Sequence, residues 1–98
     1  MKIVINRCYG GFSISKEAEL FMADLGNEKA TDNLGNNSDY REYDRNDPDL
    51  IAAVEELGEE ANGTFASLKV VEIPNGIEWK IEEYDGMEWV SEVHRTWR

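Results

Sequence analysis

The sequence contains 98 residues, the length of one domain, and we expect a single domain over residues 1–98. Its formal net charge of −11 repels polyanions, so composition argues against direct binding to nucleic acids or to anionic membranes. Cys8 is the only cysteine, which excludes a disulfide within the chain. Because the sequence also lacks a signal-peptide pattern and a long apolar run, we expect a cytoplasmic protein.

The first 26 residues predict a strand followed by a helix. Lys2–Asn6 is rich in β-branched residues, as buried strands are. Ser15 has the residue type of a helix N-cap, and apolar residues follow it at helical spacing until Gly26, which would end the helix. The segment that joins the two elements has the sequence CYGGFSIS.

The segment 27–46 is polar, and only Leu34, Tyr40 and Tyr43 offer large side chains for burial. A segment of this length without secondary structure is uncommon in a compact domain. Two alternatives remain open: the segment is mobile, or residues 40–43 form a short edge strand.

A second helix is predicted after this segment. Asp47 and Pro48 are the residue types preferred at an N-cap and at the first helical position. An apolar stripe continues from there to Ala61, with Gly58 in the middle of the helix.

Three strands follow. Phe65–Ile73 predicts one strand, and the segments 77–81 and 87–93 predict a hairpin around Asp85-Gly86. A two-residue turn would place Trp79 and Trp89 on opposite faces, whereas a three-residue loop would bring them to one face. Burial favours the longer loop.

This order of elements predicts an α+β fold, with a mostly antiparallel sheet of about four to five strands and two helices packed on one face. Sheet edges and aromatic residues left over from the core lead us to expect a homo-oligomer.

Positive charge is concentrated at the two ends of the chain. All 21 carboxylates lie between Glu17 and Glu92. The segments 1–16 and 93–98, outside that range, contain no acidic residue and carry these basic residues: Lys2, Arg7, Lys16, His94, Arg95 and Arg98. Because salt screens fields beyond about 8 Å, a local cationic pocket can persist on an acidic molecule.

The glycine-containing segment is a candidate anion site. Backbone N–H groups at a helix N-terminus attract anions, and glycines allow a ligand to approach the backbone. The candidate ligand-binding residues here are Arg7, Gly10, Gly11, Phe12 and Ser13. The alternative is a tight turn whose aromatic residues pack into the core.

The C-terminal tail is a second candidate. Arg95 and Trp97 could clamp a phosphate and stack on a base. In the alternative, Trp97 folds onto the sheet. Together the two segments suggest capture of a small anion that carries a planar ring.

Enzymatic and metal chemistry have little support in the sequence. Cys8 and His94 could form a nucleophile–base pair, but no third group is evident, and a buried structural cysteine is the better interpretation. One cysteine and one histidine are too few for a typical zinc site. We therefore predict no catalytic residues, no metal site and no cofactor.

Three blocks of sequence resemble a family of small proteins from phages and bacterial prophages: MKIVINRCYGGF, DPDLIAAVEELGEEANG and EWKIEEYDGMEWVSEVHRTWR. The resemblance covers residues 1–26 and 47–98, and relatives tend to carry a longer insert between the blocks. The family is in turn similar to phage anti-Thoeris sponge proteins, which are oligomers that sequester cyclic ADP-ribose-type signals without cleaving them. The resemblance implies binding of such a ligand in the host cytoplasm.

Two functions follow as hypotheses. The first is a non-catalytic binding protein that sequesters a small nucleotide signal and so blocks a host defence system. The alternative is an acidic interaction protein or DNA mimic that inhibits a host protein, with Glu55, Glu56, Glu59 and Glu60 on its exposed face.

Overall fold

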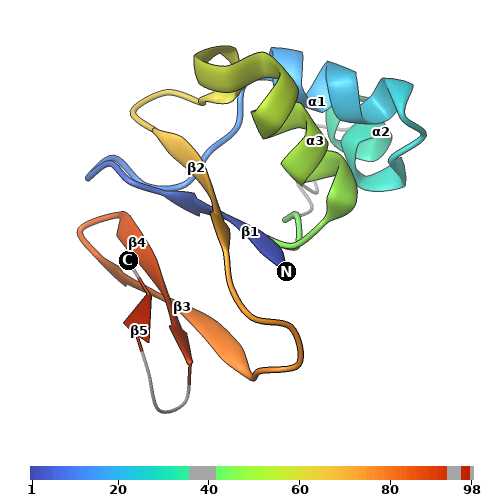
Figure 1. The fold of residues 1–98 in the computed structure, drawn as a ribbon. Helices are drawn as coiled ribbons and strands as arrows, with labels where there is room; N and C mark the ends of the chain where they lie inside the picture. The colour runs from blue at the N-terminus through green and yellow to red at the C-terminus, as the bar shows by residue number, and fades with distance from the viewer. Residues whose placement is uncertain (36–41, 93–95, 98) are drawn as a thin grey trace.

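A computed structural model describes residues 1–35, 42–92 and 96–97 (Figure 1). The described helices are α1 (Lys16–Asp24), α2 (Glu28–Gly35), α3 (Pro48–Leu57) and a 3-10 turn, η1 (Gly58–Ala61). The described strands are β1 (Lys2–Asn6), β2 (Leu68–Glu72), β3 (Trp79–Tyr84), β4 (Met87–Glu92) and β5 (Thr96–Trp97). Within these residues, every helix is too short or too polar to span a bilayer.

The expected first strand and first helix are confirmed. β1 occupies Lys2–Asn6, and the Ser15 hydroxyl oxygen caps α1 by accepting a hydrogen bond from the Ala18 N–H at 3.1 Å. Gly26 lies just beyond the helix with a φ of +90°, a conformation that favours glycine.

The polar segment after Gly26 begins with a helix, so the expectation of a segment without regular structure is wrong for residues 28–35. Asn27 acts as the cap of α2, because its Oδ1 accepts from the Ala30 N–H at 3.0 Å. Ala30 is buried in the main core. The proposed edge strand falls partly on residues 40 and 41, outside the described range, and residues 42–44 have no regular secondary structure.

The start of α3 is confirmed, but its end is not. Asp47 Oδ1 accepts from the Asp49 N–H at 2.8 Å, and Pro48 is the first helical residue. Gly58 is the C-cap, with a φ of +58°, rather than a residue in the middle of a longer helix. Gly58 therefore ends the α-helix, and η1 carries the chain on to Ala61.

The second strand is shorter than expected. β2 begins at Leu68, whereas Phe65 lies in the preceding turn with a φ of +62° and is 77% exposed. Because a β-branched or aromatic side chain is disfavoured at positive φ, the turn at Phe65 stores backbone strain.

The hairpin has the two-residue turn, so the register predicted from burial is wrong. Tyr84 pairs with Met87 across Asp85-Gly86, and Glu82 pairs with Trp89. Asp85 and Gly86 both have positive φ, as a type I′ turn requires.

Trp89 therefore lies on the outer face of the hairpin, where its indole N–H finds a partner. The Glu82 carboxylate accepts hydrogen bonds from the Ser91 hydroxyl at 2.8 Å and from Trp89 Nε1 at 3.1 Å. Chiefly through the Ser91 bond, these contacts lower the pKa of Glu82 below its ordinary value.

The α+β class is confirmed. The expectation of a single sheet is wrong, and so is the expectation of two helices. The described strands form two antiparallel sheets, β1-β2 and β3-β4-β5, and three α-helices are present. Figure 1 shows the helices against one side of β1-β2 and the hairpin on the other side. Val4 faces the helical core, whereas Ile3 and Ile5 face a second core that includes Val90 of the hairpin.

The sheets stay separate because the second edge of β1 is already occupied. The Val4 N–H donates to the Arg45 carbonyl at 2.8 Å, and the Asn6 N–H donates to the Glu88 carboxylate at 2.8 Å. A loop and a side chain thus satisfy the backbone groups that a third strand would otherwise pair with.

We predict that Gly10→Ala destabilises the fold. A Cβ at Gly10 would lie 2.1 Å from the carbonyl oxygen of Phe65 and 2.2 Å from its Cβ. Relief of this overlap should reduce the free energy of unfolding by about 1–3 kcal/mol, measured by urea denaturation. Gly35→Ala is the control, because a Cβ there meets nothing within 4 Å. Equal stability of the two variants would contradict the packing.

Candidate functional site

A hollow of about 250 Å³ opens between the segment that follows β1 and the loop that precedes α3. It is lined by Phe12, Ser13, Glu42, Tyr43 and Arg45. The lining thus combines two aromatic rings, a guanidinium, a carboxylate and two hydroxyl groups. We take this hollow as the candidate site.

The Arg45 guanidinium is fixed on two sides. Its central carbon lies 3.6 Å from the centroid of the Phe12 ring, a cation–π stacking distance. Its two terminal nitrogens bind the Glu88 carboxylate at 2.5 and 2.9 Å. This bidentate geometry holds the guanidinium at the wall of the hollow.

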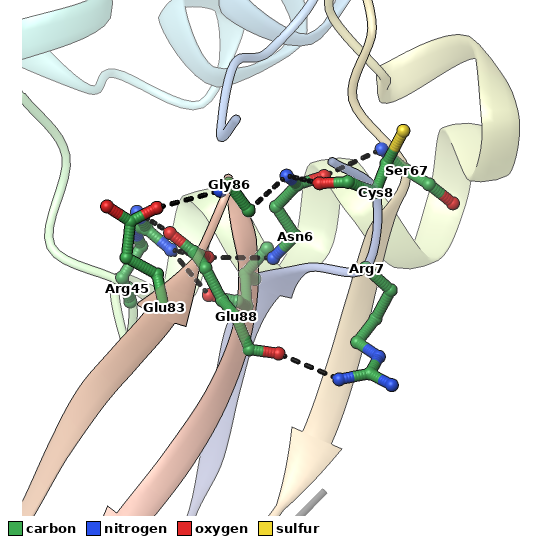
Figure 2. Close-up of polar contacts among 9 residues, drawn as sticks. Asn6, Arg7, Cys8, Arg45, Ser67, Glu83, Gly86 and Glu88 are labelled. Carbon is green, nitrogen blue, oxygen red and sulfur yellow. Dashed lines mark hydrogen bonds and ion pairs between the residues drawn. The ribbon is translucent and has the colours of Figure 1, made fainter. Parts of the chain in front are cut away.

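The Glu88 carboxylate is the centre of the polar network in Figure 2. It is 6% exposed and accepts from the Asn6 N–H in addition to Arg45. The Glu88 carbonyl accepts from Arg7 Nη1 at 2.9 Å. Because each acceptor has charged or backbone donors, the network offsets the cost of burying the carboxylate.

The Tyr43 side chain ties the hollow to the helices. Tyr43 is 6% exposed. Its hydroxyl donates to the Glu19 carboxylate of α1 at 2.8 Å and accepts from Asn33 Nδ2 of α2 at 3.1 Å. Both helices therefore position this wall of the site.

Charge in and around the hollow is balanced or negative among the described residues. The Arg45 charge is compensated by Glu88, and Glu42 is exposed at the lining. This arrangement does not attract a bare phosphate. It suits a planar, hydrogen-bonding ring, which can lie on aromatic or guanidinium faces.

The structure brings two of the predicted ligand-binding residues into the hollow, Phe12 and Ser13. Arg7 lies half-buried in the Glu88 network instead. Gly10 packs closely against Phe65, as the tight-turn alternative requires.

The remaining predicted residues are placed as follows. Gly11 has a φ of +91° and lies beside Gly86. A Cβ added to Gly86 would lie 2.5 Å from the Gly11 nitrogen. Arg95 lies outside the described residues, as does His94, and only the backbone of Trp97 is described, paired with Val90. The meeting of the two cationic segments therefore stays a prediction.

Arg45 and Tyr43 are the site residues that sequence analysis missed. Both belong to the polar segment 27–46, in which residue types alone gave little reason to single out either. The available signal was Tyr43, one of three large side chains in that segment. The partner of Arg45 lies 43 residues away in sequence, which no local pattern reveals.

No group of three or more metal-ligating side chains is present among the described residues. Cys8 is half-buried and free. Its expected role as a structural residue and the absence of catalysis stay predictions.

No protein-family model matches the chain, and no match was found among curated proteins or among solved structures. The resemblance to phage and prophage proteins therefore rests on the three sequence blocks alone.

We predict that Glu88→Gln lowers the free energy of unfolding by about 2–3 kcal/mol, because it leaves the Arg45 charge without its counterion in a largely buried position. Urea denaturation measures the loss. Glu72→Gln, on an exposed strand position, is the control and should change stability by less than about 0.5 kcal/mol. If the two variants are equally stable, the ion pair between the loop and the hairpin does not stabilise the fold.

Proposed function

We propose that the chain is a non-catalytic binding protein that holds the planar ring of a small nucleotide-derived ligand in the hollow. The observation that supports this most is the stack of Arg45 on Phe12 beside the hydroxyl groups of Ser13 and Tyr43. Sequestration of a cyclic ADP-ribose-like signal, and with it a block on a host defence system, is the biological form of this proposal.

The size of the hollow limits which part of the ligand it takes. At about 250 Å³ it lies just below the usual range of about 300–1,000 Å³ for sites that enclose a drug-sized molecule. A single base fits this volume better than a whole dinucleotide. The phosphates would then lie outside the hollow.

The chemistry of the lining supports binding rather than catalysis. The Ser13 hydroxyl donates to the Thr64 carbonyl at 3.3 Å, and the Tyr43 hydroxyl donates to Glu19. The described partner of the Ser13 hydroxyl is a carbonyl, which cannot remove its proton, and the Glu19 carboxylate holds a Tyr43 hydroxyl that also bonds to Asn33.

Ligand binding can be tested by thermal unfolding with adenine, adenosine, ADP and cyclic ADP-ribose. A ligand that binds only the folded chain raises the melting temperature in proportion to the logarithm of its concentration above Kd. We expect a rise with at least one adenine compound, and mass spectrometry should recover that compound intact after heating. Unchanged melting across the panel would refute the proposal.

The role of the aromatic wall can be tested separately. Phe12→Leu keeps an apolar side chain but removes the ring beneath Arg45, so affinity should fall by about 5- to 150-fold, the worth of one stacked base. Tyr84→Leu is the matched control, since Tyr84 is 69% exposed and does not line the hollow. Equal losses in both variants would place the ligand elsewhere.

A second function is supported by the distribution of acidic residues. The four helical segments carry ten carboxylates and only two lysines, Lys16 and Lys29. Glu55, Glu56, Glu59 and Glu60 are all exposed on α3 and η1. This surface is compatible with a DNA mimic that occupies the basic groove of a host protein.

Competition for a basic bacterial DNA-binding protein tests this second function. The chain should release that protein from duplex DNA, and raised salt should suppress the release. Replacing the four glutamates of α3 and η1 with glutamine should abolish it. The matched control removes as many charges from β3, β4 and the residues beside them, at Glu78, Glu83, Asp85 and Glu92. Equal release by both variants would exclude mimicry by the helical surface.

A further inference from the structure

Three turns meet at one end of the molecule, and each carries an exposed aromatic side chain. Tyr9 follows β1, Phe65 precedes β2 and Tyr84 lies at the β3-β4 turn, and they are 64%, 77% and 69% exposed. Figure 1 shows the three turns on the same side of the ribbon. We call these turns the aromatic loops.

A single buried side chain fixes the aromatic loops to one another. Asn6 is fully buried, and its Nδ2 donates to the carbonyls of Cys8 at 2.7 Å and Gly86 at 2.8 Å. Its Oδ1 accepts from the Ser67 N–H at 2.8 Å (Figure 2). All three turns are therefore held by one amide, so the aromatic side chains are presented on a preorganised backbone.

The turns also touch directly. A side chain at position 10 would overlap Phe65. A side chain at position 86 would overlap the backbone of Tyr9 and Gly11. Exposure of aromatic residues on a rigid, closely packed base is typical of a contact surface, because little conformational entropy remains to be lost on binding.

We propose that the aromatic loops are the contact surface between two copies of this chain. The loop segments 8–12, 63–68 and 84–87 contain one charged residue, Asp85, in a chain with a net charge of −11. A second copy meets less like-charge repulsion here than at the helices, where carboxylates outnumber lysines by ten to two.

The strands beside the aromatic loops carry opposite charges that could pair between two copies of the chain. β2 pairs with one edge of β1 and the Glu88 side chain of the hairpin bonds to the other edge, so Lys69 and Glu83 belong to strands on opposite sides of β1. The Glu83 carboxylate also accepts from the Gly86 N–H at 3.0 Å. Both side chains are exposed. A two-fold axis that runs between the flanks sets the lysine of each protomer against the carboxylate of its partner.

The area indicates a weak dimer. The exposed parts of the three aromatic side chains amount to about 400 Å². A stable interface buries about 800 Å² from each partner, so the loop backbones and flanks must supply the remainder. We therefore expect a dimer that dissociates on dilution. This inference does not depend on whether the hollow binds a ligand.

Sedimentation velocity of the full chain over a range of concentrations tests the inference. The expected result is a monomer–dimer equilibrium that shifts toward dimer as salt is added, because salt screens the repulsion between two acidic chains. A chain that stays monomeric at every concentration overturns it and leaves the aromatic loops to a partner of another kind.

The variant Phe65→Gly distinguishes a loss of dimerisation from a loss of folding stability. Glycine suits the positive φ at this position, so the variant should fold at least as stably as the wild type while losing the ring. We expect dimerisation to weaken at least tenfold. Leu25→Ser is the control, since Leu25 is 52% exposed on the helical side. Unchanged dimerisation of Phe65→Gly would place the interface elsewhere.

The flanks are tested by a charge exchange at low salt. Lys69→Glu alone should weaken the dimer, and adding Glu83→Lys in the same chain should restore it. Failure of the double variant to recover association would overturn the proposed orientation of the two copies.

Discussion

The buried ion pair between Arg45 and Glu88 determines how the parts of this fold fit together. β1 must satisfy backbone groups on the side that β2 does not cover. The Val4 N–H donates to the Arg45 carbonyl, and the Asn6 N–H donates to the Glu88 carboxylate. The Arg45 guanidinium also binds the Glu88 carboxylate, so the two groups that replace a neighbouring strand are joined to each other. Loop, hairpin and central strand are thereby connected through two side chains.

The same pair explains why one sheet became two. A hairpin aligned with β1 through backbone bonds would have extended the first sheet. Instead it is held by the side chain of Glu88 and by the carbonyl bond to Arg7, and Ile3 and Ile5 pack against its apolar face. β1 consequently contributes alternate residues to two cores, so a strand of five residues organises both.

The pair also determines what the hollow offers a ligand. Arg45 stacks on Phe12 because Glu88 holds it in place, but Glu88 also compensates its charge. The hollow gains a rigid planar surface and loses its attraction for an isolated anion. A nucleotide-derived ligand would be recognised here through its ring, and its phosphates would require groups beyond the described lining.

Local signals in the sequence predicted the elements that depend on local interactions. Ser15 and Asp47 capped helices as expected, and Asp85-Gly86 formed a hairpin turn. The turn geometry prevailed over the burial pattern because Trp89 could bond its indole to Glu82 on the outer face. Preference for burying every tryptophan was the wrong criterion there.

The elements that were missed depend on contacts distant in sequence. α2 has few apolar residues, and its burial depends on α1 and on Tyr43, which the sequence does not place beside it. Arg45 stands in a polar segment in which residue types alone gave little reason to select it. Its importance follows only from Phe12 and Glu88, which the fold brings to it from both ends of the chain.

The segment CYGGFSIS connects the two surfaces on which function is proposed. Tyr9 belongs to the aromatic loops, and Phe12 and Ser13 line the hollow, with two glycines between them. Gly10 is required for close packing on Phe65, so the glycines serve first to position what flanks them. Acidic residues gather on the helices, away from this segment. A chain of strong negative charge thus keeps a nearly neutral region in which aromatic side chains can make contacts that charge would otherwise oppose.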